Sequence, residues 1–296
     1  MKNSQSQLAK ELHDQYFTPV DTAKWCYEKT AEATGWDFVG TALEPSVGAF
    51  AFVEAAQLLG LKLDWTTNDL YPQLNQSPDT VLDYPKSDFQ RFDYIITNPP
   101  FGPSNTLVKS FMKKSLNLSD KVMMLLPKGV RRLGFQDAMP RTARRLFDLD
   151  LVDETFHIPG FETRQVKTCV QAWCQTDIPQ PTLKSQLDLR TDIFSIWASD
   201  KEETFRHHPK HGNADGQICR WGAMGRTRKE LVRSGAWQSI KLNRTDVSWE
   251  NFESICKTLC FDDFKDMSSS QPAFDVPVFV HRFNTAAAAC GFLRPL

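Results

Sequence analysis

Short apolar runs alternate with longer segments of helical periodicity through the first 175 residues of the chain. The apolar runs are typical of buried strands, and the segments between them favour helices. The predicted strands cover residues 39–43, 61–67, 92–97, 122–126, 151–157 and 168–174, and the predicted helices cover residues 18–34, 50–59, 104–118 and 140–149. This alternation predicts an α/β fold with a mostly parallel, doubly wound sheet.

The first predicted helix has recognisable boundary residues. Thr18 is suited to cap its N-terminus, Pro19 to occupy the first position, and Asp21 to serve as the acid of a capping box. Gly35 is expected to end the helix. The last predicted helix of this region, residues 140–149, is strongly basic.

The pattern changes after residues 178–181, which read Ile-Pro-Gln-Pro. Beyond them lie polar loops, scattered tryptophans and one predicted helix around residues 249–259. We therefore divide the chain into residues 1–176, which carry the alternating pattern, and residues 177–296, whose pattern predicts no particular fold.

Composition is that of an ordinary globular protein, with 41% hydrophobic and 24% charged residues among 296. No run approaches the ~18 apolar residues of a membrane span, so we expect no membrane association. The first residues are polar and lack the apolar stretch of a signal peptide, which favours a cytoplasmic location.

Charge is unevenly distributed although the net charge is only −1. Residues 1–100 hold 7 Lys or Arg against 14 Asp or Glu, whereas residues 206–244 hold 9 against 2. Residues 128–145 form a second basic stretch. A phosphate backbone could be tracked along such cations, although a charge run is often only a solvated face.

Metal binding is not expected from the seven cysteines, which show no CxxC spacing. His207, His208, His211 and Cys219 are close in sequence, but their spacing fits no strong metal template.

The most informative motif is Asn98-Pro99-Pro100-Phe101, which follows the apolar run 92–97. The second proline lacks an N–H and restricts the residue before it, so the turn is stiff. Such a turn could hold two acceptors, the Asn98 side-chain oxygen and a backbone carbonyl, beside an amino group. Asn-Pro is also a common turn, so the motif gains weight from matching segments upstream.

Four further segments accompany this motif in order along the chain. Residues 15–19 read Gln-Tyr-Phe-Thr-Pro, and residues 43–48 read Leu-Glu-Pro-Ser-Val-Gly directly after the first predicted strand. Asp69 and Asp83 follow the second predicted strand. Phe161 precedes the last predicted strand. Each has a structural alternative: a capped helix, a turn, a loop aspartate or a buried phenylalanine.

These five segments, over about residues 15–174, resemble the ordered motifs of γ-type DNA adenine-N6 methyltransferases, which depend on S-adenosylmethionine (SAM). The resemblance implies a Rossmann-like SAM-dependent methyltransferase domain over residues 1–176 and a target-recognition region for DNA over residues 177–296. The motif set resembles that of compact solitary enzymes of phages and mobile elements, which implies an association with restriction–modification and, for a phage protein, a place in the host cytoplasm.

The resemblance also implies residue roles. Methyl transfer to an adenine flipped out of the helix is expected at Asn98, Pro99, Pro100 and Phe101. Cofactor binding is expected from Tyr16, Phe17, Thr18, Pro19, Glu44, Pro45, Ser46, Gly48, Asp69 and Asp83. Phe161 is the expected second aromatic at the target base, and the expected nucleic-acid contacts are Lys128, Arg131, Arg132, Arg220, Arg226 and Arg228.

One position departs from the family pattern: Phe50 stands where the cofactor loop is expected to have its second glycine. Three alternative functions stay open. RNA adenine-N6 methyltransferases share Asn-Pro-Pro-Phe. A protein glutamine methyltransferase is the second alternative, although it would not need so basic a C-terminal region. A degenerate methyltransferase fold that only binds nucleic acid is the third, and Phe50 favours it.

Overall fold

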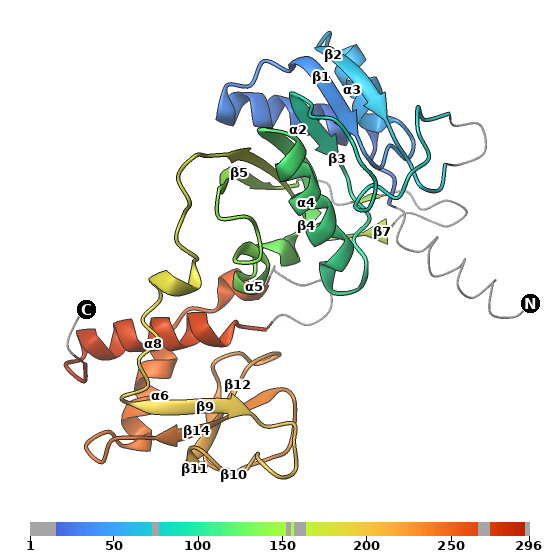
Figure 1. The fold of residues 1–296 in the computed structure, drawn as a ribbon. Coiled ribbons are helices and arrows are strands. Elements are labelled where there is room, and N and C mark those ends of the chain that lie inside the picture. Colours follow the sequence, from blue (N-terminus) through green and yellow to red (C-terminus); the bar gives the residue numbers. More distant parts are fainter. Residues whose placement is uncertain (1–15, 73–76, 152–154, 157–163, 266–272, 294–296) are drawn as a thin grey trace, which may run out of the picture. The chain divides into compact units, whose positions relative to one another are not determined.

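The computed structural model describes residues 16–72, 77–151, 155–156, 164–265 and 273–293 (Figure 1). The chain divides into two compact units, Met1–Pro181 and Thr182–Leu296, called here the N-terminal and C-terminal units. The sequence pattern predicts a division after residue 176.

A six-stranded sheet forms the centre of the N-terminal unit, with the order β2-β1-β3-β4-β8-β5. Its strands are β1 (Val39–Glu44), β2 (Lys62–Thr67), β3 (Tyr94–Thr97), β4 (Lys121–Pro127), β5 (Ala143–Asp150) and β8 (Thr168–Gln175). Strands β2, β1, β3 and β4 are parallel, and β8 runs antiparallel to both of its neighbours. The predicted α/β fold with a mostly parallel sheet is confirmed.

The direction of winding reverses between β1 and β3. Helix α3 (Ala51–Leu58) connects β1 to β2 in one direction, and α4 (Thr106–Leu118) connects β3 to β4 in the other. Right-handed crossovers in opposite directions place their helices on opposite faces of the sheet. The loops after β1 and β3 therefore meet at a topological switch point, where doubly wound sheets bind ligands.

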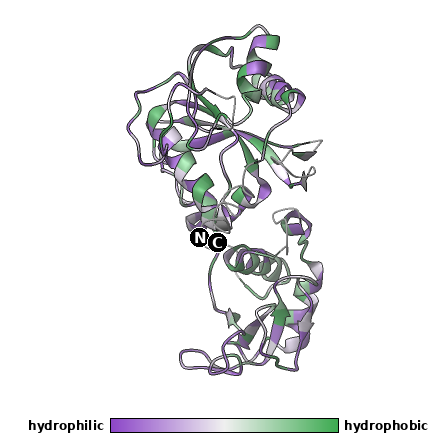
Figure 2. Cartoon of the chain, turned by 90° about the vertical axis from the view of Figure 1, so that its right-hand side faces the viewer, coloured by the Kyte–Doolittle hydropathy of each residue, from purple (hydrophilic) through white to green (hydrophobic). Residues whose placement is uncertain are grey.

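Buried apolar strands hold this unit together. All four residues of β3 and the five central residues of β4 are buried. Helix α2 (Val20–Thr34) is fixed by Tyr27, whose ring packs edge-on against Phe38 and whose hydroxyl donates to the Phe52 carbonyl. In Figure 2, much of the central strands is coloured green, which marks hydrophobic residues.

The predicted basic helix at residues 140–149 is wrong. These residues form β5, which pairs antiparallel with β8 and has an irregular register between Arg145 and Phe147. Arginine, alanine and leucine favour a helix intrinsically, but pairing with the buried β8 decides the structure. Within the strand predicted at 151–157, the structure describes Leu151, which lies outside any strand, and the two-residue β6 (Thr155–Phe156), which pairs with β7 (Arg164–Gln165).

The remaining short elements of the N-terminal unit lie beside the strand ends: η1 (Pro103–Asn105), η2 (Lys128–Arg131) and α5 (Leu133–Gln136). Among the described residues of the whole chain, no helix has the length and hydropathy needed to cross a membrane.

The C-terminal unit contains a four-stranded antiparallel sheet, which the sequence analysis did not predict. Its order is β13-β12-β14-β9, with bounds Phe194–Ala198 for β9, Gly216–Cys219 for β12, Thr227–Arg228 for β13 and Trp237–Leu242 for β14. A small hairpin joins β10 (His207–His208) to β11 (Gly212–Asn213), and η3 (Lys184–Gln186) precedes the sheet.

Three helices accompany this sheet: α6 (Trp249–Thr258), α7 (Asp262–Lys265) and α8 (Val276–Ala289). The predicted helix around residues 249–259 is confirmed by α6, which begins with a capping box between Ser248 and Asn251. Phe194 of β9, Phe252 of α6, and Phe279 and Phe283 of α8 form the core, with ring centroids 4.8–6.1 Å apart.

Substituting Gly216 with alanine should destabilise the C-terminal unit. A Cβ atom on Gly216 would lie 2.1 Å from the Trp249 ring. That ring is buried and stacks on Phe252, so it has little room to move. We expect Gly216→Ala to lower the free energy of unfolding by about 1–3 kcal/mol, the usual range for overpacking.

The control is Gly235→Ala, because a Cβ there would lie an ordinary 3.9 Å from the Trp221 ring. Urea unfolding followed by tryptophan fluorescence measures both variants. Equal stability of the two would contradict the close packing of Gly216 against Trp249.

Candidate functional site

Asn98 lies directly after β3 and holds a fixed orientation. Its Nδ2 donates to the Tyr16 carbonyl oxygen at 3.0 Å and to the Thr18 hydroxyl oxygen at 3.1 Å. A carbonyl oxygen only accepts, so Nδ2 and not Oδ1 must face Tyr16. The donor end of the carboxamide is therefore fully used by residues 16–18.

The acceptor end of the same carboxamide, in contrast, makes no hydrogen bond among the described residues. Its oxygen, Asn98 Oδ1, is buried without such a partner. Such atoms are rare, because burying a polar atom without a partner is costly. Asn98 Oδ1 is thus a candidate acceptor for an N–H or O–H group from outside the chain.

Thr18 does not have the capping role predicted for it. Helix α2 begins at Val20, and Pro19 occupies the cap position without a side-chain hydrogen bond. The Thr18 hydroxyl instead accepts from Asn98, far away in sequence. A local capping pattern cannot reveal such a long-range contact.

Aromatic rings surround this position. Phe101 is buried and stacks on Tyr16, with ring centroids 5.4 Å apart and an interplanar angle of 25°. Tyr16 also meets the buried Phe156 edge-on at 6.1 Å. A residue predicted for the cofactor and one predicted for catalysis are therefore in direct contact.

The backbone after the Asn-Pro-Pro-Phe motif is strained. Ser104 and Asn105 have φ values of 53° and 59°, in the left-handed region that non-glycine residues rarely adopt. Gly102 has φ 65°, and a Cβ there would lie 2.7 Å from the Leu107 side chain. Strain of this kind is often found beside functional sites.

The loop after β1 brings several predicted cofactor residues together. The Gly48 N–H donates to Asp69 Oδ2 at 2.9 Å, so Asp69 reaches across from the end of β2. Gly48 has φ 50°, and a Cβ there would lie 3.3 Å from the Phe17 ring. Phe17, Gly48 and Asp69 thus form one cluster.

Glu44 ends β1 and is almost fully buried, as is the following Pro45. Its Oε1 accepts from the Ser46 N–H at 3.3 Å. Burial raises the pKa of the Glu44 carboxyl well above its ordinary value, and the nearby Asp69 adds to the rise.

Phe50 adopts a backbone conformation that glycine favours. It precedes α3 with φ 63° and ψ 19°, in the left-handed region. The departure from the family pattern therefore changes the side chain and stores strain, while the glycine-like turn of the loop is kept.

Asn68 is an important residue that the sequence analysis missed. It is fully buried, and its Nδ2 donates to the carbonyl oxygens of Pro45 and Leu82, both at 3.0 Å. Its Oδ1 accepts from the Leu82 N–H and from the Thr80 hydroxyl. Asn68 thereby ties the loop after β1 to residues 80–82, and no sequence motif signals this role.

Asp83 follows residues 80–82, but its carboxylate is in an ion pair with Lys86 at 2.7 Å and is partly exposed. No described contact joins it to Asp69. The predicted role of Asp83 in cofactor binding stays a prediction. Phe161 lies outside the described residues.

The residues predicted to contact nucleic acid differ in their partners and in their exposure. Lys128 and Arg131 form ion pairs with Asp150, and Arg131 also binds Asp148 through two nitrogens. Arg132 lies beside them at the end of η2. The predicted arginines of the C-terminal unit are Arg220, which donates to the Phe274 carbonyl, Arg226, which is exposed, and Arg228, which pairs with Glu230.

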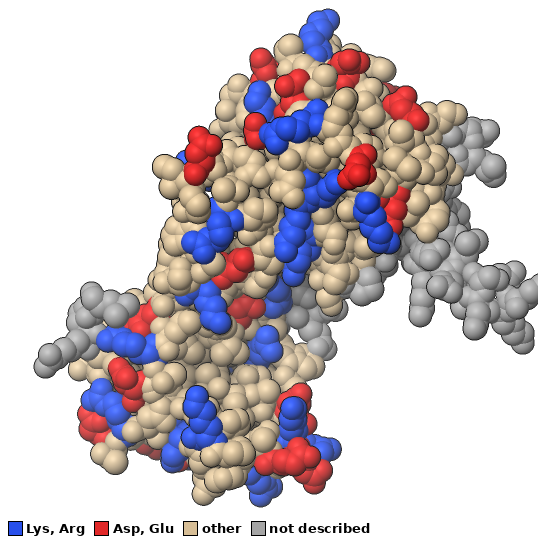
Figure 3. Space-filling view, viewed as in Figure 1, with Lys and Arg blue, Asp and Glu red and all other residues tan. Residues whose placement is uncertain are grey.

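Lys and Arg are interspersed with Asp and Glu over the face shown in Figure 3. In the described part of the chain, no group of three His, Cys, Asp or Glu could hold a metal ion. His208 and His211 instead pack with the Trp197 ring.

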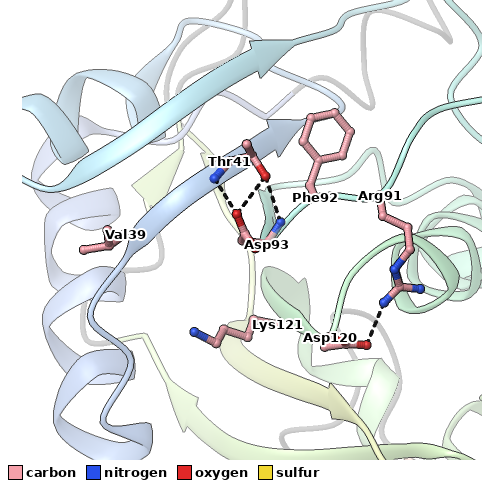
Figure 4. A pocket seen from close by; sticks show the side chains of 7 residues that line it. All are labelled: Val39, Thr41, Arg91, Phe92, Asp93, Asp120 and Lys121. Atoms are coloured by element: carbon pink, nitrogen blue, oxygen red, sulfur yellow. Dashed lines mark hydrogen bonds and ion pairs between the residues drawn. The ribbon is translucent and has the colours of Figure 1, made fainter.

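A cavity of about 290 Å³ lies at the amino ends of β1, β3 and β4, the edge opposite the candidate site (Figure 4). Charged side chains that line it already have partners within the chain. Arg91 pairs with Asp120 at 2.8 Å, and Asp93 accepts a hydrogen bond from the Thr41 N–H at 2.7 Å. We therefore take the switch point at the carboxyl edge as the functional site.

No protein-family model and no curated protein matches the chain. Among solved structures, it is similar to a "putative RNA methyltransferase" from Pyrococcus horikoshii, at 19% identity and a TM-score of 0.43, over 55% of this chain and 88% of that one. A "putative class I S-adenosylmethionine-dependent methyltransferase" from Listeria monocytogenes gives 12% identity and a TM-score of 0.40, over 56% and 63%.

A type I restriction–modification methyltransferase subunit from Streptococcus thermophilus gives 12% identity and a TM-score of 0.38, over 55% of this chain and 44% of that one. These likenesses are remote. We therefore take the function from the residues and geometry of this chain.

Removing the Asn68 side chain should loosen the loop after β1. Asn68→Ala would leave the backbone groups of Pro45 and Leu82 without these partners, at about 1 kcal/mol for each lost bond. We expect the free energy of unfolding to fall by about 2–4 kcal/mol. Asn117→Ala on the exposed side of α4 is the control, and chemical denaturation of both variants is the measurement. Similar stabilities would show that Asn68 does not anchor this loop.

Glu44 should make stability depend on pH. Its pKa is raised by burial in the folded chain, so the folded state retains the proton after the unfolded state, with a pKa of about 4.3, has lost it. Stability is therefore lost as pH rises above about 4.3, and the neutral Glu44→Gln avoids this loss. We expect Glu44→Gln to exceed the wild type by about 1 kcal/mol or more at pH 8, and by little at pH 4.

Urea unfolding at both pH values measures this difference, with Glu54→Gln on the exposed side of α3 as the control. A Glu44→Gln advantage that grew toward low pH would contradict the expected direction.

Proposed function

We propose that the protein transfers a methyl group from SAM to the N6 amino group of adenine in DNA. The observation that carries this proposal is the buried, unpartnered Oδ1 of Asn98. Because Nδ2 is held by Tyr16 and Thr18, the carboxamide presents only an acceptor. An amino group satisfies such an acceptor, whereas a keto oxygen at the same place would be repelled.

The residues around Gly48 fit a SAM molecule. Gly48 is in the left-handed region, and a Cβ there would lie 3.3 Å from the Phe17 ring, so glycine lets Phe17 pack against this loop. Asp69 follows β2, where a carboxylate accepts from ribose hydroxyls in doubly wound folds. SAM would supply an activated methyl group on its sulfonium, and the Phe17–Gly48–Asp69 cluster would hold it one strand away from Asn98.

Asn98 would activate the amino group through hydrogen bonding. The lone pair of an aromatic amine is conjugated with its ring, which makes the nitrogen a poor nucleophile. Acceptance of its two N–H groups by Asn98 Oδ1 and the Pro99 carbonyl favours a pyramidal nitrogen with an available lone pair. These bonds strengthen as positive charge develops on nitrogen, so they stabilise the transition state more than the ground state.

Phe101 would stack on the target base. A base inside a duplex cannot reach a buried acceptor, so the adenine must flip out of the helix. Phe101 and Tyr16 are already stacked, and aromatic rings favour stacking on a planar ring. Phe161 is the proposed second aromatic.

DNA is the proposed partner, with the C-terminal unit as its target-recognition region. Arg226 is an exposed cation of that unit, and arginine is suited to guanine edges and to phosphates. A role in restriction–modification, in a phage or mobile element, accords with this proposal.

The first test of the function is mass spectrometry of nucleosides from unmethylated DNA and from RNA, each incubated with the protein and SAM. We expect N6-methyladenine in DNA. Asn98→Ala should lower the rate at least about 100-fold, the usual loss when one transition-state hydrogen bond is removed. Asn117→Ala should methylate like the wild type.

Other outcomes overturn parts of the proposal. The mark in RNA alone would make the protein an RNA methyltransferase, and methylated glutamine in a peptide substrate would make it a protein methyltransferase. No product together with no SAM binding by calorimetry would favour the degenerate fold. Full activity of Asn98→Ala would refute the role of Asn98.

A further inference from the structure

Two contacts determine how the Asn98 carboxamide is oriented, and they differ in kind. The Tyr16 contact is made by a backbone carbonyl, which every residue type would supply. The Thr18 contact is made by a side-chain hydroxyl, which only serine or threonine would supply at this place. Thr18 is therefore the side chain that the Asn98 Nδ2 group needs for its second hydrogen bond.

The surroundings make this contact specific. Thr18 is only 9% exposed, and Asn98 Oδ1 is buried. Water is therefore a poor substitute for the hydroxyl. Thr18 also does not cap α2, so its hydroxyl has no helix-capping duty in competition with Asn98.

Residues 16–18 contact both halves of the candidate site. Phe17 lies against Gly48 in the loop after β1, while Tyr16 and Thr18 bind Asn98 after β3. A change in Thr18 can thus affect either the cofactor or the target amino group, and the two effects are separable by measurement.

We propose that Thr18 is a positioning residue for the reaction: its hydroxyl occupies the second Nδ2 hydrogen of Asn98 and so keeps Oδ1 directed at the amino group of the substrate. This inference rests on the proposed function. It assigns Thr18 to the orientation of Asn98, whereas the family resemblance assigned Thr18 to the cofactor.

Loss of the Thr18 hydroxyl should affect both ends of the Asn98 carboxamide. Without the hydroxyl, one Nδ2 hydrogen is buried without a partner, and the carboxamide gains freedom to rotate about χ2. Each departure from the observed orientation moves the acceptor away from the substrate amine. Productive complexes then become fewer while cofactor binding is retained, so the loss is expected in kcat.

The experiment compares Thr18→Val, which has nearly the same shape, with Thr18→Ser, which keeps the hydroxyl. We expect Thr18→Val to lower kcat about tenfold or more, with the dissociation constant for S-adenosylhomocysteine within about twofold of the wild type. Thr18→Ser should recover kcat to within about threefold. Thr285→Val, on the exposed side of α8, should behave like the wild type.

A second measurement does not depend on activity. NMR of the Asn98 side-chain amide, assigned by its loss in Asn98→Ala, reports exchange of the two Nδ2 hydrogens with solvent. We expect slow exchange in the wild type and Thr18→Ser, and at least about tenfold faster exchange in Thr18→Val. This result would stand even if the wild type methylated neither DNA nor RNA, which would be the failure of the proposed function.

Two outcomes overturn the inference. Thr18→Val with wild-type kcat and a large loss of S-adenosylhomocysteine affinity would make Thr18 a cofactor ligand. Thr18→Val and Thr18→Ser with equal kcat and equal amide exchange would show that the hydroxyl does not orient Asn98.

Discussion

The right-handed crossover is the constraint on which the candidate site depends. Strands β1 and β3 pair in parallel at the centre of the sheet, and their following helices α3 and α4 leave in opposite directions. The loops after the two strands cannot be covered by either crossover, so they form an open edge. Glu44–Gly48 and Asn98–Phe101, distant in sequence, are neighbours for this reason.

Asn68, which is fully buried, and Asn98, whose Oδ1 atom is buried, illustrate at this edge how one residue type serves structure or chemistry. Asn68 uses both ends of its carboxamide, toward Pro45, Leu82 and Thr80. Asn98 uses only its donor end within the described residues. The satisfied amide stabilises a loop, and the half-satisfied amide leaves a directed acceptor for a substrate.

The segment at residues 16–18 gives the site much of its rigidity. Tyr16 stacks on Phe101, Phe17 lies against Gly48, and Thr18 accepts from Asn98. Three consecutive side chains thus join the loop after β1 to the loop after β3. Phe50, Ser104 and Asn105, which have left-handed φ values, lie in the two loops that these contacts hold.

Local sequence patterns were sufficient where hydrophobic periodicity determines structure. Buried runs predicted β3 and β4, and the alternation of strands with helices predicted the α/β class. The same reasoning failed at residues 140–149, since pairing of β5 with β8 outweighs helix propensity. It also missed the C-terminal sheet, whose core depends on Phe194, Phe252, Phe279 and Phe283 meeting across long separations.

The sequence by itself determined which chemical groups are present after the strands: the Asn-Pro-Pro-Phe turn, the loop with Gly48, and Asp69. Only the tertiary structure decided what those groups do to one another. The Thr18–Asn98 contact, the anchoring role of Asn68 and the unpartnered Oδ1 of Asn98 all arise from long-range hydrogen bonding. A local pattern contains no information about such bonds, because their partners are brought together only when the sheet is assembled.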